Sequence, residues 1–302
     1  MPRCHRGAPR HVRAGAEVVL AAGAIGTPKL LELSGIGAPE VLGRHGIAVR
    51  HALPGVGENL RDHLQIRTVF RVSGARTLND RAATLAGRIG IAAEYAWRRS
   101  GPMAMAPSQL GIFTRSSDAY ETPNIEYHVQ PLSLDAFGQP LHREPALTVS
   151  VCNLRPLSRG SSHLRSADPF APPEIRPNYL SDPADREVAV DCVRHARRLM
   201  RAEALRRYAP SEVLPGAELV SDAALAEAAG AISTTIFHPV ATARMGADPM
   251  AVVDAELRVH GLAGLSVADA SVMPTIPSGN THAPVTMIAE KAAVMILARA
   301  AA

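Results

Sequence analysis

The chain has 302 residues, of which 47% are hydrophobic and 20% charged, and its formal net charge is +4. This balance is typical of a globular protein with a buried core, and it excludes a chain that is disordered throughout. The length allows one large domain or two domains of ordinary size.

The first 37 residues predict a strand, a glycine turn and a helix. The apolar run 17–22 (EVVLAA) ends at Gly23 and indicates a strand that is buried on both faces, as in a parallel sheet. Thr27 then offers an N-cap and Pro28 the first helical position, so a short helix is expected over 29–33. This order is one arm of a doubly wound α/β domain, in which ligands lie beyond the carboxyl ends of the strands.

The middle of the chain, residues 64–232, predicts a second domain of the α+β class. Three segments rich in alternating, β-branched or aromatic residues suit an antiparallel sheet with one covered face, and helical patterns lie between and after them. The strands are expected over 64–72, 125–130 and 147–154, and the helices over 82–99 and 184–200.

Residues 233–302 again show the strand, loop and helix pattern of an α/β domain that the first 37 residues show. The short apolar strand 265–268 (LSVA) ends at Asp269, and a loop rich in Pro, Ser and Gly follows over 271–280. An amphipathic helix then opens at Ala283 and runs to about Ala298. Its apolar stripe consists of Val285, Ile288, Ala292, Met295 and Ile296. The α/β domain is therefore expected to be discontinuous, with segments 1–63 and 233–302.

Much of the positive charge gathers on one predicted helix and the residues after it: Arg194, Arg197, Arg198, Arg201, Arg206 and Arg207. A solvated helix face is the commoner reason for such a run, so we expect no nucleic-acid partner.

The remaining sequence features favour a cytoplasmic protein. Cys4, Cys152 and Cys192 lie far apart and form no C-x-x-C pair, which fits a reducing compartment. No apolar run reaches the roughly 18 residues of a membrane span. Residues 1–13 are basic but precede no apolar segment with a cleavage signature, so no signal peptide is expected.

Five ordered motifs carry a family resemblance. They are GAIGTPKLLELSGIG (23–37), GVGENLRDH (55–63), SRGSSHLRSADP (158–169), FHPVATARMG (237–246) and DASVMPTIPSGNTHAPVTMIAEKAA (269–293). Together they resemble the glucose–methanol–choline (GMC) oxidoreductase family, flavoenzymes that oxidise alcohols. The resemblance runs from about Arg13 to the C-terminus, and motifs of this length in this order are specific.

One element of that family is missing from the sequence. Members begin with a strand, a G-x-G-x-x-G turn and a helix that holds the ADP part of FAD, and neither this turn nor the family's first signature occurs here. The resemblance thus implies a carboxyl-terminal part of a member: a partial FAD-binding doubly wound domain (1–63 and 233–302) and an antiparallel-sheet substrate-binding domain (64–232).

The implied chemistry needs two proton-handling groups. An alkoxide is a far better hydride donor than a neutral alcohol, so the site needs a base near pH 7 and a donor that holds the developing alkoxide oxygen. The resemblance places His238 and His282 at the two catalytic positions, and histidine suits both tasks. We assign His238 as the base and His282 as the alkoxide partner, and the reverse assignment stays open. The two are too far apart in sequence for a single-helix metal pair, so zinc is discounted and no metal site is expected.

The resemblance also implies FAD contacts at Gly23, Ala24, Asp269, Ala270 and Asn280. The positive end of the helix that opens at Ala283 would stabilise the negative charge of a reduced flavin by up to about 2 kcal/mol. His63 matches a recurrent family element, for which a structural role is favoured over catalysis.

The leading hypothesis is an FAD-dependent oxidoreductase that acts on the CH–OH group of an alcohol and transfers hydride to flavin N5. A non-catalytic fragment of such an enzyme, and an enzyme of the same fold that resembles hydroxynitrile lyases, remain as alternatives. Trp97 and the five tyrosines are too scattered to indicate an aromatic cage, so composition does not support choline. The expected partners are a small-molecule alcohol and an electron acceptor, oxygen or a quinone. The sequence leaves open the identity of the alcohol, the covalent or non-covalent state of FAD and the oligomeric state.

Overall fold

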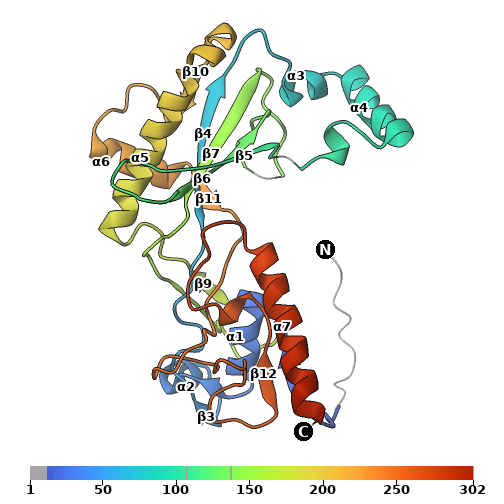
Figure 1. Cartoon of the computed structure of the whole chain (residues 1–302), viewed down its shortest axis with the longest axis vertical. Helices are drawn as coiled ribbons and strands as arrows, with labels where there is room; N and C mark the ends of the chain where they lie inside the picture. Colours follow the sequence, from blue (N-terminus) through green and yellow to red (C-terminus); the bar gives the residue numbers. More distant parts are fainter. Residues whose placement is uncertain (1–11, 107, 137, 302) are drawn as a thin grey trace.

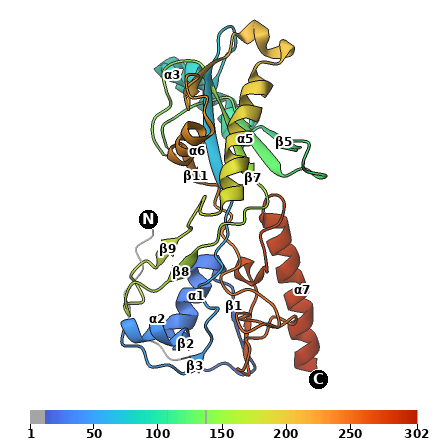
Figure 2. The ribbon, with the colours of Figure 1, turned by 90° about the vertical axis from the view of Figure 1, so that its left-hand side faces the viewer.

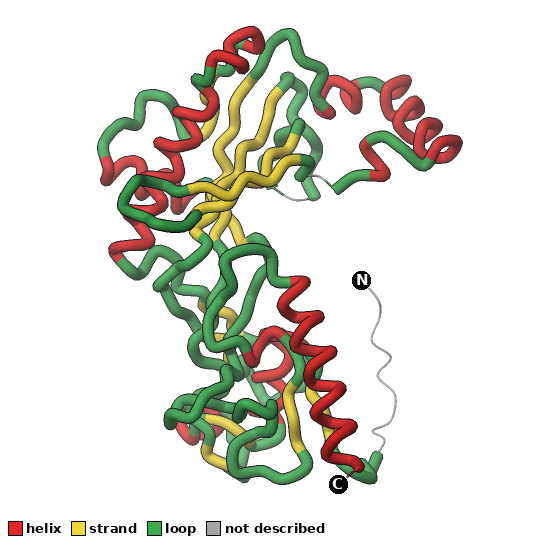
Figure 3. The backbone as a smooth tube through the Cα atoms, viewed as in Figure 1, coloured by secondary structure: helices red, strands yellow, loops and turns green. Residues whose placement is uncertain are grey.

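The computed structural model describes residues 12–301 apart from residues 107 and 137. The molecule has two lobes, one above the other, joined by strands and loops that run between them (Figure 1). The upper lobe is built on a sheet with helices on its outside, and the lower lobe holds the beginning and the end of the described chain (Figure 3). Cys4 lies outside the described residues.

The lower lobe is assembled from both ends of the chain. One hydrophobic core joins residues between 31 and 56 with residues between 240 and 292. Strand β1 pairs in parallel with β12, and β2 pairs in parallel with β3. Helix α7 runs along one side of this lobe (Figures 1 and 2). The elements are β1 (Val18–Leu20), α1 (Gly23–Leu33), β2 (Ile36–Gly37), α2 (Pro39–Arg44), β3 (His51–Ala52), β12 (Leu265–Val267), η3 (Ala270–Val272) and α7 (His282–Ala301).

Helix α1 corrects the predicted start of the first helix. It begins at Gly23, and Pro28 lies inside it instead of opening it. A proline cannot donate to the carbonyl four residues earlier, which here is that of Ala24. The hydroxyl of Thr242 donates to this carbonyl at 2.5 Å and takes the place of the missing helical hydrogen bond. Thr27 does not act as the N-cap, because its hydroxyl donates to Asp269.

Strand β1 corrects a second prediction. The segment was expected to be buried on both faces, but Val18 and Val19 are 47% and 38% exposed. The reason is that β1 has one neighbouring strand, β12, among the described residues. The doubly wound description of this domain therefore stays a prediction.

The upper lobe confirms the predicted antiparallel sheet. Strands β4, β7 and β6 correspond to the three predicted strands, and the sheet order is β10-β4-β7-β6-β5, with β11 also paired to β4. Helices α5 and α6 pack on one face of the sheet (Figure 2). The elements are β4 (Leu64–Arg71), α3 (Leu78–Ala83), α4 (Leu85–Arg98), η1 (Pro102–Ala104), β5 (Leu110–Thr114), β6 (Ile125–Gln130), β7 (Ala146–Asn153), α5 (Pro183–Met200), η2 (Glu203–Tyr208), β10 (Ser211–Leu214), α6 (Asp222–Ala231) and β11 (Ser233–Thr235).

Two helical predictions in this lobe need adjustment. The helix expected over 82–99 is α4, which begins at Leu85 after Thr84, an extended residue whose side chain caps it; residues 82 and 83 belong to the separate short helix α3. The arginine-rich helix is α5, but its face is not uniformly solvated. Arg197 is largely buried and forms a bidentate ion pair with Glu212, in which its Nε and one terminal nitrogen donate to the two carboxylate oxygens at 2.8 and 2.9 Å.

The segment between β7 and α5 returns from the upper lobe to α1. It contains β8 (Ser161–His163) and β9 (Glu174–Arg176), which lie beside α1 in the lower lobe (Figures 1 and 2). The fully buried carboxylate of Glu32 on α1 accepts from the His163 ring at 2.6 Å and from the backbone N–H of Leu164 at 2.8 Å. This segment thus anchors the two lobes to each other.

Of the two described cysteines, Cys152 and Cys192, each is free and buried. No described helix is both long enough and apolar enough to cross a membrane.

Candidate active site

The position of His238 is set by the carboxylate of Asp62, at the junction of the lobes. One carboxylate oxygen accepts the backbone N–H of His238 at 2.9 Å. The other accepts the hydroxyls of Tyr179 and Thr235. Phe237, with a φ of 65°, turns the chain so that the residue after it can reach Asp62. Asp62 therefore holds the main chain of His238 and leaves its imidazole free for another contact.

That contact is with His63. The Nδ1 atoms of His63 and His238 lie 3.1 Å apart, and the two rings meet edge to face at 80°. The Nε2 of His63 lies 3.1 Å from the carbonyl oxygen of Leu154. A carbonyl only accepts, so the Nε2 of His63 must carry a proton and donate it. In neutral His63 the Nδ1 is then an acceptor, and the proton in the bond between the rings belongs to the Nδ1 of His238.

This chain of hydrogen bonds fixes the tautomer of His238. Its Nδ1 carries the proton and its Nε2 carries the lone pair. Burial lowers the pKa of His63 to about 4, so this ring is neutral at pH 7 as the argument requires. Burial also lowers the pKa of His238, while the charges of Asp62 and Glu126 oppose that shift. The result is a neutral imidazole with an unprotonated Nε2 at pH 7.

His282 is not part of the hydrogen-bonded chain that contains His238 and His63. It is the first residue of α7 and is exposed, as is Asn280 just before the helix. Within the part of the chain that the structure describes, no hydrogen bond or ring contact joins His282 to His238. The predicted pairing of these two histidines thus stays a prediction, whereas the contact between His63 and His238 is present.

The predicted cofactor residues fall into two groups. Gly23 and Asp269 are joined by a hydrogen bond of 3.0 Å from the backbone N–H to the carboxylate, which brings the start of α1 to the end of β12. The carboxylate of Asp269 also accepts from Thr27 and from the backbone N–H of Ser271, so it braces this junction. Ala24 and Ala270 flank the junction, and Asn280 lies outside it.

The start of α1 fits an oxygen-rich group such as a part of FAD. The N-cap residue Ala22 offers no capping side chain and the first turn has no acidic residue, so apart from the Gly23 N–H that Asp269 accepts, the N-terminal amides can attract a negative group. A Cβ added to Gly23, whose φ is +76°, would meet no atom within 4 Å, so the space beside this turn is open.

The sequence did not predict the positioning role of Asp62, and for His63 it predicted a structural role but not the contact with His238. Both belong to the motif GVGENLRDH, which was noted as a family element, but the contact with His238 spans 175 residues of sequence. The two signals that could have found them are the adjacent Asp-His pair and its place directly before a predicted strand.

Comparisons with known proteins agree with this mixed α/β fold with an antiparallel sheet. A family model described as GMC oxidoreductase matches residues 156–289, and a second model with the same description matches residues 3–65. The chain belongs to the GMC oxidoreductase family.

Its relatives are oxidoreductases. An alcohol dehydrogenase (acceptor) of Pseudomonas putida is 40% identical over 283 residues, which are 93% of this chain and 51% of that protein. An oxygen-dependent choline dehydrogenase of Photobacterium profundum is 39% identical and covers 96% of this chain and 51% of its own. The formate oxidase of Aspergillus oryzae superposes with a TM-score of 0.87 at 32% identity, over 95% of this chain and 55% of that one. The chain therefore spans about half the length of these relatives. The family and its FAD enzymes support FAD as the cofactor.

Proposed function

We propose that the chain carries the catalytic residues of an FAD-dependent oxidoreductase that oxidises the CH–OH group of an alcohol. The observation that supports this most is the chain of hydrogen bonds from His238 through His63 to the carbonyl of Leu154, from which we infer an unprotonated Nε2 on His238. Bound FAD supplies the acceptor for the hydride that leaves the alcohol carbon. The residues of this chain supply the proton chemistry.

In this proposal the Nε2 of His238 takes the proton of the substrate hydroxyl as the hydride departs. The imidazolium that results keeps its Nδ1–H bond to His63, and the nearby negative charge of Asp62 stabilises it. The base is thus neutral before the reaction and stabilised after it. This reasoning favours His238 over His282 as the base.

His282 is proposed to hold the alkoxide oxygen from the start of α7. This helix is 20 residues long and its first turn has no acidic residue, so its N-terminus presents a positive end to a developing negative charge. Gly23, Ala24, Ala270 and Asn280 are proposed to contact FAD, and Asp269 to brace the two segments that carry the first three of them.

The test is flavin reduction in the FAD-reconstituted chain. Anaerobic mixing with a series of primary and secondary alcohols is expected to bleach the flavin absorbance. His238→Gln should slow that bleaching at least about a hundredfold, which corresponds to about 2.7 kcal/mol of transition-state stabilisation. The matched control is His45→Gln, because His45 ends α2 at a distance from the site in the fold.

Three outcomes would contradict the proposal. A chain that binds no FAD under any loading condition supports the fragment alternative. Flavin that stays oxidised while a cyanohydrin is cleaved supports the lyase alternative. A His238→Gln variant that is reduced as fast as the His45→Gln control removes His238 from the chemistry.

A further inference from the structure

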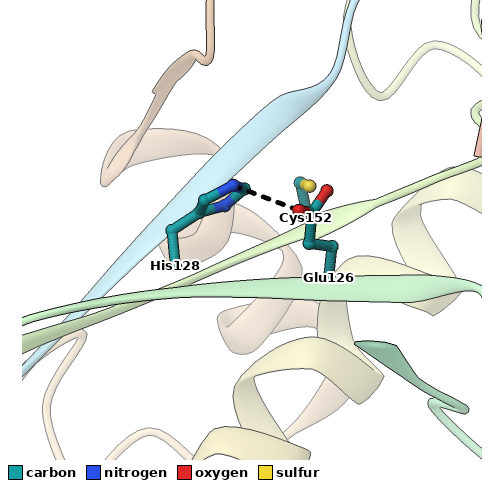
Figure 4. Close-up of side chains that lie close together, drawn as sticks. All are labelled: Glu126, His128 and Cys152. Atoms are coloured by element: carbon teal, nitrogen blue, oxygen red, sulfur yellow. Dashed lines mark ion pairs between the residues drawn. The ribbon is translucent and has the colours of Figure 1, made fainter. Parts of the chain in front are cut away.

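Helix α4 lies outside the candidate active site. The sheet face that carries Glu126, His128 and Cys152 (Figure 4) adjoins that site: burial lowers the pKa of His238, and the charge of Glu126 is among those that oppose this shift. Helices α3 and α4 instead project from the end of the sheet that is farther from the lower lobe (Figures 1 and 3). The proposed reaction therefore leaves α4 without a role.

Helix α4 is held by the protein along one side. Of its 14 residues, all of them described, only Ile91 is buried. Glu94 lies three residues further and so on the same side, where its carboxylate accepts from the guanidinium of Arg81 on α3 at 2.9 Å. Thr84 caps the first turn by accepting the backbone N–H of Gly87 at 3.1 Å. The helix is thus fixed in place while its other side faces outward.

The outer face of α4 carries apolar side chains alone. Its exposed residues recur at the spacing of one helical face: Leu85, Ile89, Ala92, Ala93 and Ala96. Leu85 is 75% exposed and Ile89 60%, and Trp97, beside the last of them, is 91% exposed. A helix that faces water normally carries polar residues on that side. A continuous apolar face in this position therefore indicates a surface that binds something.

Positive charge borders this outer face. Arg88 lies within the helix, and Arg98 and Arg99 lie at its end, directly after Trp97. Among the described residues none of these three arginines forms an ion pair with a carboxylate, whereas Glu94, the one acidic residue of the helix, is already paired with α3. The surface is therefore apolar in the middle and basic at its borders, and it has no free negative charge.

This combination fits the interface of a membrane. An amphipathic helix that lies in the plane of a bilayer buries its apolar face among the lipids and places its arginines near anionic headgroups. Tryptophan is enriched at the same depth, because its ring is apolar and its N–H is polar. A second copy of the chain fits less well, since two such faces would bring their unpaired arginines together.

We propose that the outer face of α4 docks the chain on the surface of a membrane that contains anionic lipids. The helix lies along the plane of the bilayer and does not cross it. The apolar side chains supply most of the attraction, and the arginines supply the preference for negative lipids. This surface is separate from the candidate active site, so the proposal does not depend on the proposed function.

The chain contains its own reporter for this contact, because Trp97 is its one tryptophan. The full chain is mixed with vesicles of phosphatidylcholine and phosphatidylglycerol, and separately with vesicles of phosphatidylcholine alone. With the anionic vesicles, the emission of Trp97 should shift to shorter wavelength and be quenched by lipids brominated on their acyl chains, and the protein should sediment with the vesicles. Binding to phosphatidylcholine alone should be at least about tenfold weaker, because the attraction between arginines and anionic lipids is lost.

Two variants locate the contact. Ile89→Asp places a negative charge in the middle of the outer face and should weaken binding to the anionic vesicles at least about tenfold. Leu297→Asp is the matched control, because Leu297 is a 70% exposed residue of α7 in the lower lobe, and this variant should bind as the unsubstituted chain does. Circular dichroism and thermal melting show which variants are folded. The quenching of Trp97 in the unsubstituted chain tests the contact without any variant.

Four results would overturn the proposal. The first is an emission of Trp97 that the anionic vesicles leave unchanged. The second is equally tight binding to vesicles without anionic lipid. The third is equal binding by the folded Ile89→Asp and Leu297→Asp variants, which would place the contact on another surface. The fourth is a dimer in light scattering that Ile89→Asp dissociates while the unsubstituted chain binds no vesicles, which would make this face an interface between proteins.

Discussion

The contact between His63 and His238 yields the sharpest prediction. In His63→Leu the Nδ1–H of His238 loses its acceptor, and nothing fixes which nitrogen carries the proton. A donor left unpaired in a partly buried site costs about 1–3 kcal/mol. Since about 1.4 kcal/mol corresponds to a factor of ten in rate, flavin reduction should slow by about tenfold to a hundredfold.

His63→Gln provides the conservative variant. Glutamine offers a carbonyl that accepts from His238 and an amide that donates to Leu154, so it should restore much of the lost rate. The assay is anaerobic stopped-flow reduction of FAD-loaded protein across pH 5 to pH 9. Each variant is also checked for flavin content and melting temperature, so that a loss of fold is recognised.

The pH profile separates positioning from a merely structural role. Reduction should increase with pH as His238 loses its proton. The lone pair of His63 favours the imidazolium form of His238, so removing it lowers the pKa of His238 further and moves the rise to lower pH. If His63→Leu keeps both the rate and the pH profile of the unsubstituted chain, the tautomer argument is refuted.

Two further predictions concern stability. Burial alone disfavours a charged His163, but its hydrogen bonds to Glu32 and Glu58 outweigh burial and raise its pKa to about 9. This stabilisation is fully present below the unfolded value of about 6.5 and is lost as the pH rises through 9, so unfolding in urea should show a loss of about 3 kcal/mol over that range that is absent in His163→Gln. Thr242→Val should lower the free energy of unfolding by about 1–3 kcal/mol, because the carbonyl of Ala24 loses its partner. Thr286→Val is the control, because it removes a hydroxyl whose hydrogen bond to the carbonyl of His282 is exposed, and it should lower the free energy of unfolding by less. An equal decrease of the free energy of unfolding in the two variants would contradict this account of α1.

Sequence alone predicts the elements whose signals are local. The three central strands are visible because their alternation and β-branched residues extend over several positions, and α5 is visible because Asp182 and Pro183 mark its start. Strands β10 and β11 could not be predicted, because a strand of three or four residues such as Ser233–Thr235 is too short to show an alternating pattern. Their pairing with β4 is set by the tertiary structure.

The start of α1 shows why the rest could not be predicted. Pro28 has a strong local preference for the first helical turn, and the hydroxyl that makes its actual position tolerable belongs to Thr242, more than two hundred residues away. The same holds for the candidate site. Asp62 and His63 are adjacent in the sequence, but the fold that brings His238 within 3.1 Å of His63 spans 175 residues and cannot be derived from either segment.

The central claim is that His238 presents an unprotonated Nε2, and nitrogen-15 NMR of the histidine rings tests it most directly. His238→Gln and His63→Gln assign the two signals in the FAD-loaded chain near pH 7. The account predicts the Nδ1–H tautomer for His238 and the Nε2–H tautomer for His63, with a coupling across their shared hydrogen bond. A His238 ring that carries its proton on Nε2, or that is charged at this pH, would contradict it.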